Sequence, residues 1–329
     1  MNTLQSMYNL ETVVRSIREF FHRKNFHEVI TPILHTGLPL EPTAYPLITF
    51  WQKMKAGKTL YLATSPESFL KKMLATGLGN CFAISKSFRN LEDGGKLNLP
   101  EFLMLEWYRE KADYILIMKE IQELIIWINE QLPHYGRKES FFIDQTKKWQ
   151  VYSFIELFDK YANLDYGKIL SGNNLFPLAK KQGYLIEKDT TWEQLFNQLF
   201  LNGIYPHLPL TPFFLVDFPG RISPLCKVRK TNPQIAERFE LFIGGIEIAN
   251  GNTESTDSVQ ITKFFSEERM YRKRNQKLIS VIDQGFISAV RKMGKKPYTY
   301  AGAGLGIERL VMILTNKSDI KDVVLQEVV

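Results

Sequence analysis

The feature that most constrains the fold is a pair of strand-like segments joined by a polar, Gly-containing loop. The first segment, 85–90, ends on Arg89 and Asn90, and the second, 100–108, carries Phe102, Glu106 and Tyr108. An arginine can bind a carboxylate and a phosphate together, and an aromatic ring can lie against a purine. A carboxylate with a tyrosine hydroxyl can hold an ammonium group. An ordinary amphipathic hairpin explains these residues equally well, so the rest of the chain has to decide.

Two further segments favour the functional interpretation. Residues 20–32 read as a helix end, a turn and a strand that opens at Pro32, and residues 302–312 run from a Gly-rich strand into a helix carrying Arg309. Together with the hairpin they resemble motifs 1, 2 and 3 of the class II aminoacyl-tRNA synthetases, and most of all the lysyl branch. Any one motif is weak evidence, since Gly-rich strand-to-helix turns are common, but here all three occur in the family's order.

The chain is long enough to bury a full core: it has 329 residues, of which 44% are apolar. No apolar run is long enough to span a bilayer and the start lacks a signal sequence, so we expect a cytoplasmic protein. The two cysteines, Cys81 and Cys226, sit in apolar contexts that are typical of free thiols. The net charge of +7 favours an acidic partner.

Hydrophobic periodicity predicts a single α+β domain over 1–329, with a mostly antiparallel sheet flanked by helices. The predicted helices are 11–24, 68–75, 114–132, 149–161, 191–201 and 262–277. The predicted strands outside the hairpin are 30–34, 60–64, 213–219 and 238–248, the last interrupted at Gly244 and Gly245. The final helix is expected to expose a row of basic side chains: Arg269, Arg272, Lys273, Arg274 and Lys277.

The resemblance to motifs 2 and 3 implies an ATP site with two catalytic arginines. Arg89 would bridge the substrate carboxylate and the α-phosphate, orienting the nucleophile and stabilising charge. Phe102 would stack on adenine, and Arg309 would hold the ring from the other face or bind the γ-phosphate. The loop departs from the family pattern, and its expected ATP contacts are Glu92, Lys96, which replaces a histidine, and Asn98.

A magnesium site is implied at Glu240 and Glu247. These residues are an odd number of positions apart, so one regular strand would put them on opposite faces. A bulge or turn at Gly244–Gly245 would bring both carboxylates to one side, where they could hold Mg²⁺ against the ATP phosphates. The alternative is an acidic strand end followed by a turn.

The amino-acid pocket implied by the lysyl resemblance suits lysine or β-lysine. Glu67 would accept from the substrate α-ammonium, although a glutamate that only complements the helix dipole explains it as well. Gly304 would let the substrate backbone approach closely; ligases of this branch often have Ala there, which slightly favours α-lysine. The full predicted substrate set is Glu67, Arg89, Glu106, Tyr108, Asn250, Glu254 and Gly304.

Motif 1 begins almost at the first residue, so we expect no anticodon-binding domain. Stand-alone domains of this layout resemble the elongation factor P lysine ligases, which implies transfer of lysine or β-lysine from an adenylate to a lysine of that protein. Two alternatives stay open: aminoacylation of tRNA or a small molecule without anticodon reading, which we consider less favoured, and a regulatory module that senses lysine or its adenylate. The family resemblance also implies a homodimer built on motif 1.

Overall fold

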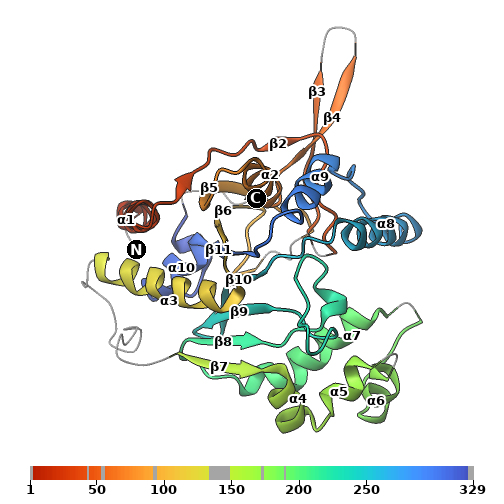
Figure 1. Cartoon of the computed structure of the whole chain (residues 1–329). Coiled ribbons are helices and arrows are strands. Elements are labelled where there is room, and N and C mark those ends of the chain that lie inside the picture. Colours follow the sequence, from red (N-terminus) through yellow and green to blue (C-terminus); the bar gives the residue numbers. More distant parts are fainter. Residues whose placement is uncertain are drawn as a thin grey trace.

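A single large sheet runs through the computed structural model, which describes residues 3–42, 44–52, 56–91, 95–132, 149–171, 174–188 and 190–324. Within these ranges the sheet has eight strands in the order β1-β5-β6-β11-β10-β9-β8-β7 (Figure 1). The strands are His27–Glu28 (β1), Cys81–Phe88 (β5), Glu101–Glu110 (β6), Gln150–Ser153 (β7), Phe213–Val216 (β8), Arg238–Ile243 (β9), Ile246–Thr253 (β10) and Tyr300–Gly306 (β11).

The sheet is mixed: its central strands are antiparallel, as predicted, but the pairs at both edges are parallel, which the prediction did not include. Neighbouring strands from β5 across to β8 are antiparallel, but β1 pairs parallel with β5 and β7 pairs parallel with β8. Parallel neighbours need a long crossover connection. Both edges have such a connection. Residues 29–80 connect β1 to β5, and the largely helical residues 154–212 connect β7 to β8. The α+β class itself agrees with the prediction.

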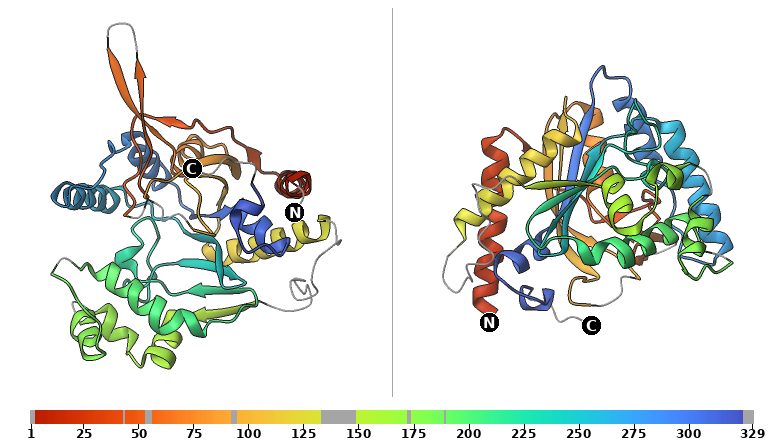
Figure 2. Two further views of the ribbon diagram at one scale, coloured as in Figure 1. Left: turned by 180° about the vertical axis from the view of Figure 1, so that it is seen from behind. Right: turned by 90° about the horizontal axis from the view of Figure 1, so that it is seen from below.

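Helices cover both faces of the sheet (Figure 2). One face carries α1 (Thr3–Arg23), α3 (Tyr114–Gln131) and α10 (Ile307–Leu314), and the other carries α2 (Glu67–Thr76), α8 (Ser258–Arg274) and α9 (Gln284–Met293). Beside β7 to β9 lie α4 (Phe154–Ala162), α5 (Tyr166–Leu170), α6 (Leu175–Lys181) and α7 (Trp192–Leu199). Short π or 3₁₀ turns occur at Phe200–Ile204, Tyr205–His207, Gly220–Ile222 and Ile320–Asp322.

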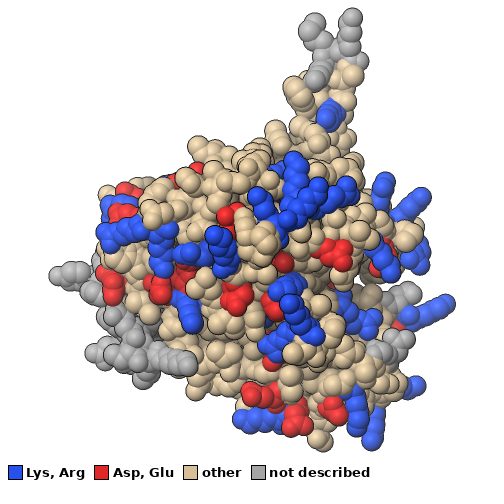
Figure 3. All heavy atoms as spheres, in the orientation of Figure 1, with Lys and Arg blue, Asp and Glu red and all other residues tan. Residues whose placement is uncertain are grey.

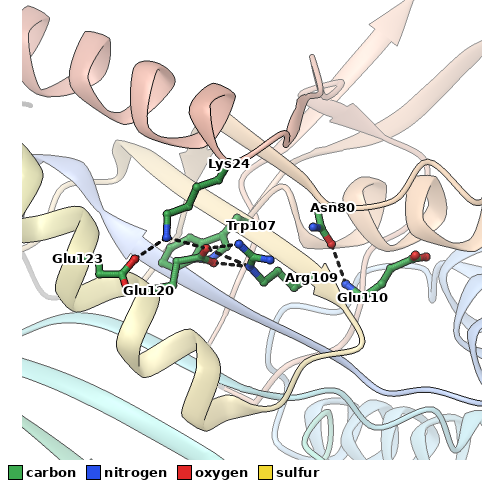
Figure 4. Close-up of polar contacts among 7 residues, drawn as sticks. All are labelled: Lys24, Asn80, Trp107, Arg109, Glu110, Glu120 and Glu123. Atoms are coloured by element: carbon green, nitrogen blue, oxygen red, sulfur yellow. Dashed lines mark hydrogen bonds and ion pairs between the residues drawn. The ribbon is translucent and has the colours of Figure 1, made fainter.

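Strand β6 has the hydrophobic core on one face and polar side chains on the other. Leu105 and Trp107 are fully buried in the main core with α1, α3 and α10. Because side chains alternate along a strand, Glu106 and Tyr108 point to the opposite face. A polar network fixes the core side: the Glu120 carboxylate of α3 accepts from Trp107 Nε1 at 3.0 Å and from Arg109 Nη2 at 2.7 Å, and Lys24 Nζ lies 3.8 Å from the same carboxylate (Figure 4).

A second, three-stranded sheet projects from the body (Figure 1). It consists of β2 (Leu34–His35), β3 (Ile48–Gln52) and β4 (Gly57–Leu62), in the order β2-β4-β3. The strand predicted over 30–34 is therefore wrong, as only Leu34 belongs to a strand. The sequence pattern was apolar there, but Pro32 has no N–H to donate to a ladder.

The helix predicted over 149–161 starts too early. Residues Gln150–Ser153 form β7, and α4 begins at Phe154, where the Ser153 hydroxyl caps it by accepting from the Ile155 N–H at 3.0 Å. None of the helices in the described ranges has the length and apolar character that a bilayer span needs. Cys81 and Cys226 are both free thiols, as predicted.

One residue of the predicted basic row on α8 is not on the surface. Arg269, Lys273 and Arg274 are exposed, but the Arg272 side chain is fully buried. Arg272 Nε donates to Glu268 Oε1 at 2.6 Å, and its guanidinium lies 4.4 Å from the ring centre of Tyr45. Helix α8 therefore uses Arg272 to hold the chain near Tyr45. On the face drawn in Figure 3, Lys and Arg side chains lie in several groups, with acidic side chains among them.

Candidate active site

The hairpin of β5 and β6 places Arg89 and Phe102 side by side, as predicted. Ser87 pairs with Phe102 in the ladder, and beyond it the Arg89 N–H donates to the Pro100 carbonyl at 3.0 Å. The Arg89 guanidinium lies 5.3 Å from the centre of the Phe102 ring. Arg89 and the ring of Phe102 thus lie together at the loop end of the β5–β6 hairpin.

Arg309 closes the same region from α10. Its Nε donates to the Leu97 carbonyl at 3.1 Å and its Nη1 donates to the Glu247 carbonyl at 3.0 Å. Its Nη2 donates to the Asn98 side-chain oxygen. These bonds join the loop before β6 to the start of β10. They bring together Arg309 and Asn98, which are both predicted ATP contacts.

Glu240 and Glu247 lie on one face because the predicted strand is a hairpin. Gly244 and Gly245 form the two-residue turn between β9 and β10, with φ of +63° and +76°, the left-handed backbone that glycine adopts readily. Glu247 pairs with Phe242, which shares a face with Glu240. The turn expected at Gly244–Gly245 is present.

A β-bulge between Glu247 and Ala249 adds a feature that the sequence did not reveal. It shifts the register by one residue, so that Asn250 rather than Ala249 pairs with Glu240. Asn250 then faces the same side as Glu247 and donates to its carboxylate, with Asn250 Nδ2 and Glu247 Oε1 3.2 Å apart. The bulge therefore adds an amide to the paired carboxylates.

A group of buried carboxylates surrounds Lys71, a residue that the sequence analysis did not single out. Lys71 Nζ pairs with Glu67 one turn earlier in α2 and lies 2.5 Å from Glu254 Oε2 at the end of β10. Lys71 also lies 5.5 Å from the ring centre of Tyr108. Glu67 and Glu254 are thus brought together as predicted, but they share an internal cation.

Glu106 and Tyr108 form a second polar pair, from the site face of β6. The Tyr108 hydroxyl donates to Glu106 Oε1 at 2.5 Å. Burial, with the charge of Glu67, raises the pKa of Glu106 well above its usual range, against the Tyr108 hydrogen bond and the Lys71 charge. The charge of Glu106 is therefore poorly compensated, and a bound cation would stabilise it.

The pKa values of two further carboxylates, Glu240 and Glu254, are also raised. Burial and the neighbouring Glu247 carboxylate raise the pKa of Glu240 to about 8, although Arg238 Nη2 donates to it at 2.8 Å. Burial raises the pKa of Glu254 to about 7. Burial alone would lower the pKa of Lys71, but the Glu254 and Glu67 carboxylates have the larger effect and raise this pKa.

Two glycines of β11 face this group with different amounts of room. A Cβ on Gly302 would lie 2.4 Å from Tyr108 Cδ1, so glycine is needed for packing there. A Cβ on Gly304 would come no closer than 3.7 Å to a protein atom, Met104 Sδ. Gly304 therefore leaves open space beside Arg89 and Asn250.

Two cavities meet at Arg89. The smaller, about 250 Å³, contains Phe102, Asn98 and Arg309 in its walls. The larger, about 470 Å³, contains Glu67, Glu106 and Tyr108. The walls of both include Arg89, Met104, Glu247, Asn250 and Gly304. Arg89 therefore lies between a cavity with Phe102 and Arg309 in its walls and a cavity with several glutamates in its walls. This arrangement is the central geometric feature of the site.

One predicted ATP contact, Lys96, is not brought to these cavities, and another, Glu92, cannot be placed. Lys96 is exposed and is absent from the described walls of both, so its role stays a prediction. Glu92 lies outside the described residues. Conversely, the walls of the larger cavity include Glu41 and Glu193, which were not singled out from the sequence.

The predicted magnesium site rests on Glu240 and Glu247 alone. Among the described residues no group of three or more His, Cys, Asp or Glu side chains is arranged to hold a metal ion. The mutual repulsion of Glu240 and Glu247 nevertheless fits a shared divalent cation, because both offer hard oxygen ligands that nucleotide phosphates could complete.

The fold is that of a class II synthetase-like domain. Residues 2–326 match the family described as tRNA synthetases class II (D, K and N), and the chain belongs to it. The chain is 34% identical over 321 residues to a lysine–tRNA ligase of Pelotomaculum thermopropionicum, covering 95% of this chain and 61% of that protein. It is 35% identical over 320 residues to an elongation factor P–(R)-beta-lysine ligase of Pseudoalteromonas translucida, covering 95% of this chain and 92% of that protein.

A lysine–tRNA ligase of Carboxydothermus hydrogenoformans is 32% identical over 317 residues, covering 95% of this chain and 63% of that protein. The chain therefore spans less than two thirds of the lysine–tRNA ligases named here.

Proposed function

We propose that the chain activates lysine or β-lysine with ATP and transfers it to a lysine side chain of elongation factor P. The observation that carries the activation step is the position of Arg89 between the two cavities. An adenylate-forming enzyme needs a nucleotide site and an amino-acid site that meet at the reacting atoms, with a cation between carboxylate and phosphate.

In the activation step, a substrate carboxylate oxygen attacks the α-phosphorus of ATP and pyrophosphate leaves. Arg89 would hold both reacting groups, Phe102 would stack on adenine, and Arg309 would hold the nucleotide from the opposite side. Glu240 and Glu247 are the residues that would hold Mg²⁺, which neutralises phosphate charge when bound. Glu106 and Tyr108 would accept a substrate ammonium.

In the transfer step, the deprotonated amine of an acceptor lysine attacks the activated carbonyl. A C–N bond forms, the bond to AMP breaks, and the amine proton is lost to solvent. Similarity to the P. translucida protein, whose name gives elongation factor P and (R)-beta-lysine, supports this acceptor. The names of the lysine–tRNA ligases favour tRNA, which is the second candidate.

The identity of the acceptor is tested by measuring the mass of each candidate acceptor after the reaction. We would incubate the protein with ATP, Mg²⁺ and either lysine or (R)-β-lysine, and offer elongation factor P and tRNA together. Our proposal predicts that elongation factor P gains one lysyl group and that tRNA stays uncharged. Charging of tRNA alone would establish the second candidate instead.

We also propose a homodimer built on the segment around Pro32. Ile30 is 95% exposed and Leu34 is 53% exposed, which leaves apolar surface in the segment around Pro32. Two-fold dimers are the commonest soluble assembly. Sedimentation at micromolar concentration would show a dimer, and a monomer there would contradict the proposal.

A further inference from the structure

Helix α7 and the π-helical turn that follows it form part of the wall of the larger cavity. Five of their residues line the cavity at three- and four-residue intervals, which puts them on one face of the helix. These residues, called the α7 face below, are Glu193, Phe196, Asn197, Phe200 and Leu201. The side chains proposed for activation lie on other elements, so that step leaves the α7 face without a role.

The α7 face lies where the larger cavity opens to solvent. Asn197 is exposed and Leu201 is 54% exposed. By contrast, Glu106 and Tyr108, in the wall of the same cavity, are only 5% and 3% exposed. A molecule that enters the cavity at Leu201 can therefore follow the α7 face inwards, and Arg89 lies in the wall of the same cavity.

The α7 face is held in place at both ends. The rings of Trp192 and Phe196 stack with their centres 5.1 Å apart, in the hydrophobic core around α4 to α7. Just after the π turn, the Tyr205 hydroxyl donates to the Gly245 carbonyl in the turn between β9 and β10. The α7 face is thus tied to a hairpin of the candidate active site, and π turns often occur at functional sites.

The chemistry of the α7 face matches the side chain of an acceptor lysine. Such a side chain has an apolar stem, which packs along apolar surface, and a cationic end. Phe200 and Leu201 offer apolar surface, and Glu193 is the one charged residue of the five. Burial and the Glu268 carboxylate raise the pKa of Glu193, against the Arg238 charge, so a nearby ammonium group would stabilise the charged form of Glu193.

The end of a tRNA suits the α7 face less well. It would bring phosphate groups, which proteins bind mainly with Arg and Lys side chains. None of the five residues is basic, and the Glu193 carboxylate would repel a phosphate. Charge and apolar surface together therefore favour a lysine side chain of a protein.

We propose that the α7 face receives the lysine side chain of the acceptor protein. Phe200 and Leu201 contact its methylene stem, and Glu193 accepts a hydrogen bond from its ammonium group. The ammonium group then loses a proton to solvent and becomes the nucleophilic amine. When this amine attacks the activated carbonyl, the C–N bond forms, the bond to AMP breaks, and a second proton is lost to solvent. The inference rests on the proposed function and deepens it, because it gives the acceptor a site of its own.

The test measures three reactions of each variant with lysine or (R)-β-lysine. They are exchange of pyrophosphate into ATP, trapping of the adenylate by hydroxylamine, and transfer to elongation factor P. Hydroxylamine is a small nucleophile and does not need the α7 face. In Leu201→Trp the larger side chain obstructs the path of the acceptor. Transfer should fall about 10–100-fold, while exchange and trapping should change by less than about two-fold.

Further variants make the result specific. Glu193→Gln removes the charge and should slow transfer about 10-fold without slowing exchange, and Glu193→Asp should restore part of the loss. The matched control is Leu185→Trp. Leu185 is 89% exposed between α6 and α7 and lies outside the walls described for both cavities, so all three reactions should proceed as in the wild type.

Unchanged transfer in both Leu201→Trp and Glu193→Gln would overturn this inference and leave the proposed function standing. An equal loss of trapping and transfer would also overturn it, because the α7 face would then act on the activated lysine. Charging of tRNA by the wild type, reduced in the same variants, would contradict the choice of a protein acceptor. A wild type that catalyses neither exchange nor trapping would instead overturn the proposed function itself.

Discussion

Lys71 and Glu254 form an ion pair in the interior of the protein: Lys71 Nζ lies 2.5 Å from Glu254 Oε2, and both side chains are 2% exposed. The pair joins α2 to the end of β10 and so connects the two halves of the amino-acid pocket. Its removal should destabilise the fold as well as the site.

Replacing Lys71 with Met keeps the volume of the side chain but leaves two buried carboxylates without their cation. We expect the free energy of unfolding, measured in urea, to fall by about 3–5 kcal/mol. The control is Lys263→Met, since Lys263 Nζ lies 3.9 Å from Glu267 on the surface. This control should lower the free energy of unfolding by less than about 1 kcal/mol. Adding Glu254→Gln to Lys71→Met should recover part of the loss. Equal, small losses in both single variants would contradict this role for Lys71.

The two glycines of β11 should respond differently to alanine. Gly302→Ala forces a methyl group into Tyr108 and should lower the free energy of unfolding by about 1–3 kcal/mol. Gly304→Ala has room in the protein, so its unfolding should be close to that of the wild type. The added methyl enters the cavity, however, and should reduce activation of lysine relative to β-lysine. Unchanged relative rates in a folded Gly304→Ala protein would show that the substrate does not approach this position.

The two carboxylates of the β9–β10 hairpin should set the magnesium requirement. Glu240→Gln and Glu247→Gln each remove a hard anionic ligand, so more Mg²⁺ should be needed for half-maximal activation. A magnesium titration of pyrophosphate exchange measures this, with Glu193→Gln as the control. The metal assignment is wrong if excess Mg²⁺ rescues neither variant while both bind ATP normally.

Glu308 should make stability depend on pH. Its carboxylate accepts from the Leu103 N–H at 2.7 Å, and burial raises its pKa from 4.5 to about 7. Between these values the folded protein keeps a proton that the unfolded chain releases, so stability falls as pH rises. The slope from this group is at most about 1.4 kcal/mol per pH unit, and it ends above pH of about 7. Glu308→Gln should flatten the stability curve over this range, and an unchanged curve would contradict the assignment.

The parts of the site that the sequence predicted depend on neighbouring residues. Arg89 and Phe102 belong to one hairpin, and a two-glycine turn brings Glu240 and Glu247 to one face. In both cases the strand period and the turn chemistry are local, so they can be read from the sequence. The role of each residue, by contrast, came from the family resemblance.

The parts that were missed depend on contacts between distant segments. Lys71 looks like a surface lysine of a helix until β10 brings Glu254 to it, and Arg272 looks like part of a basic row until the loop at Tyr45 covers it. The bulge after Glu247 leaves no mark in the sequence. The edge strand β7 was read as helix because the apolar period of α4 continues into it, and its pairing with β8 crosses about 60 residues.

The central claim is that Arg89 joins an amino-acid site to a nucleotide site. The most direct measurement is lysine-dependent exchange of pyrophosphate into ATP, for the wild type and for Arg89→Ala. We predict exchange by the wild type and a loss of about 10²–10³-fold in the variant, because it lacks a preorganised charge contact to both reacting groups. Exchange at a near-normal rate in a folded Arg89→Ala protein would contradict the account.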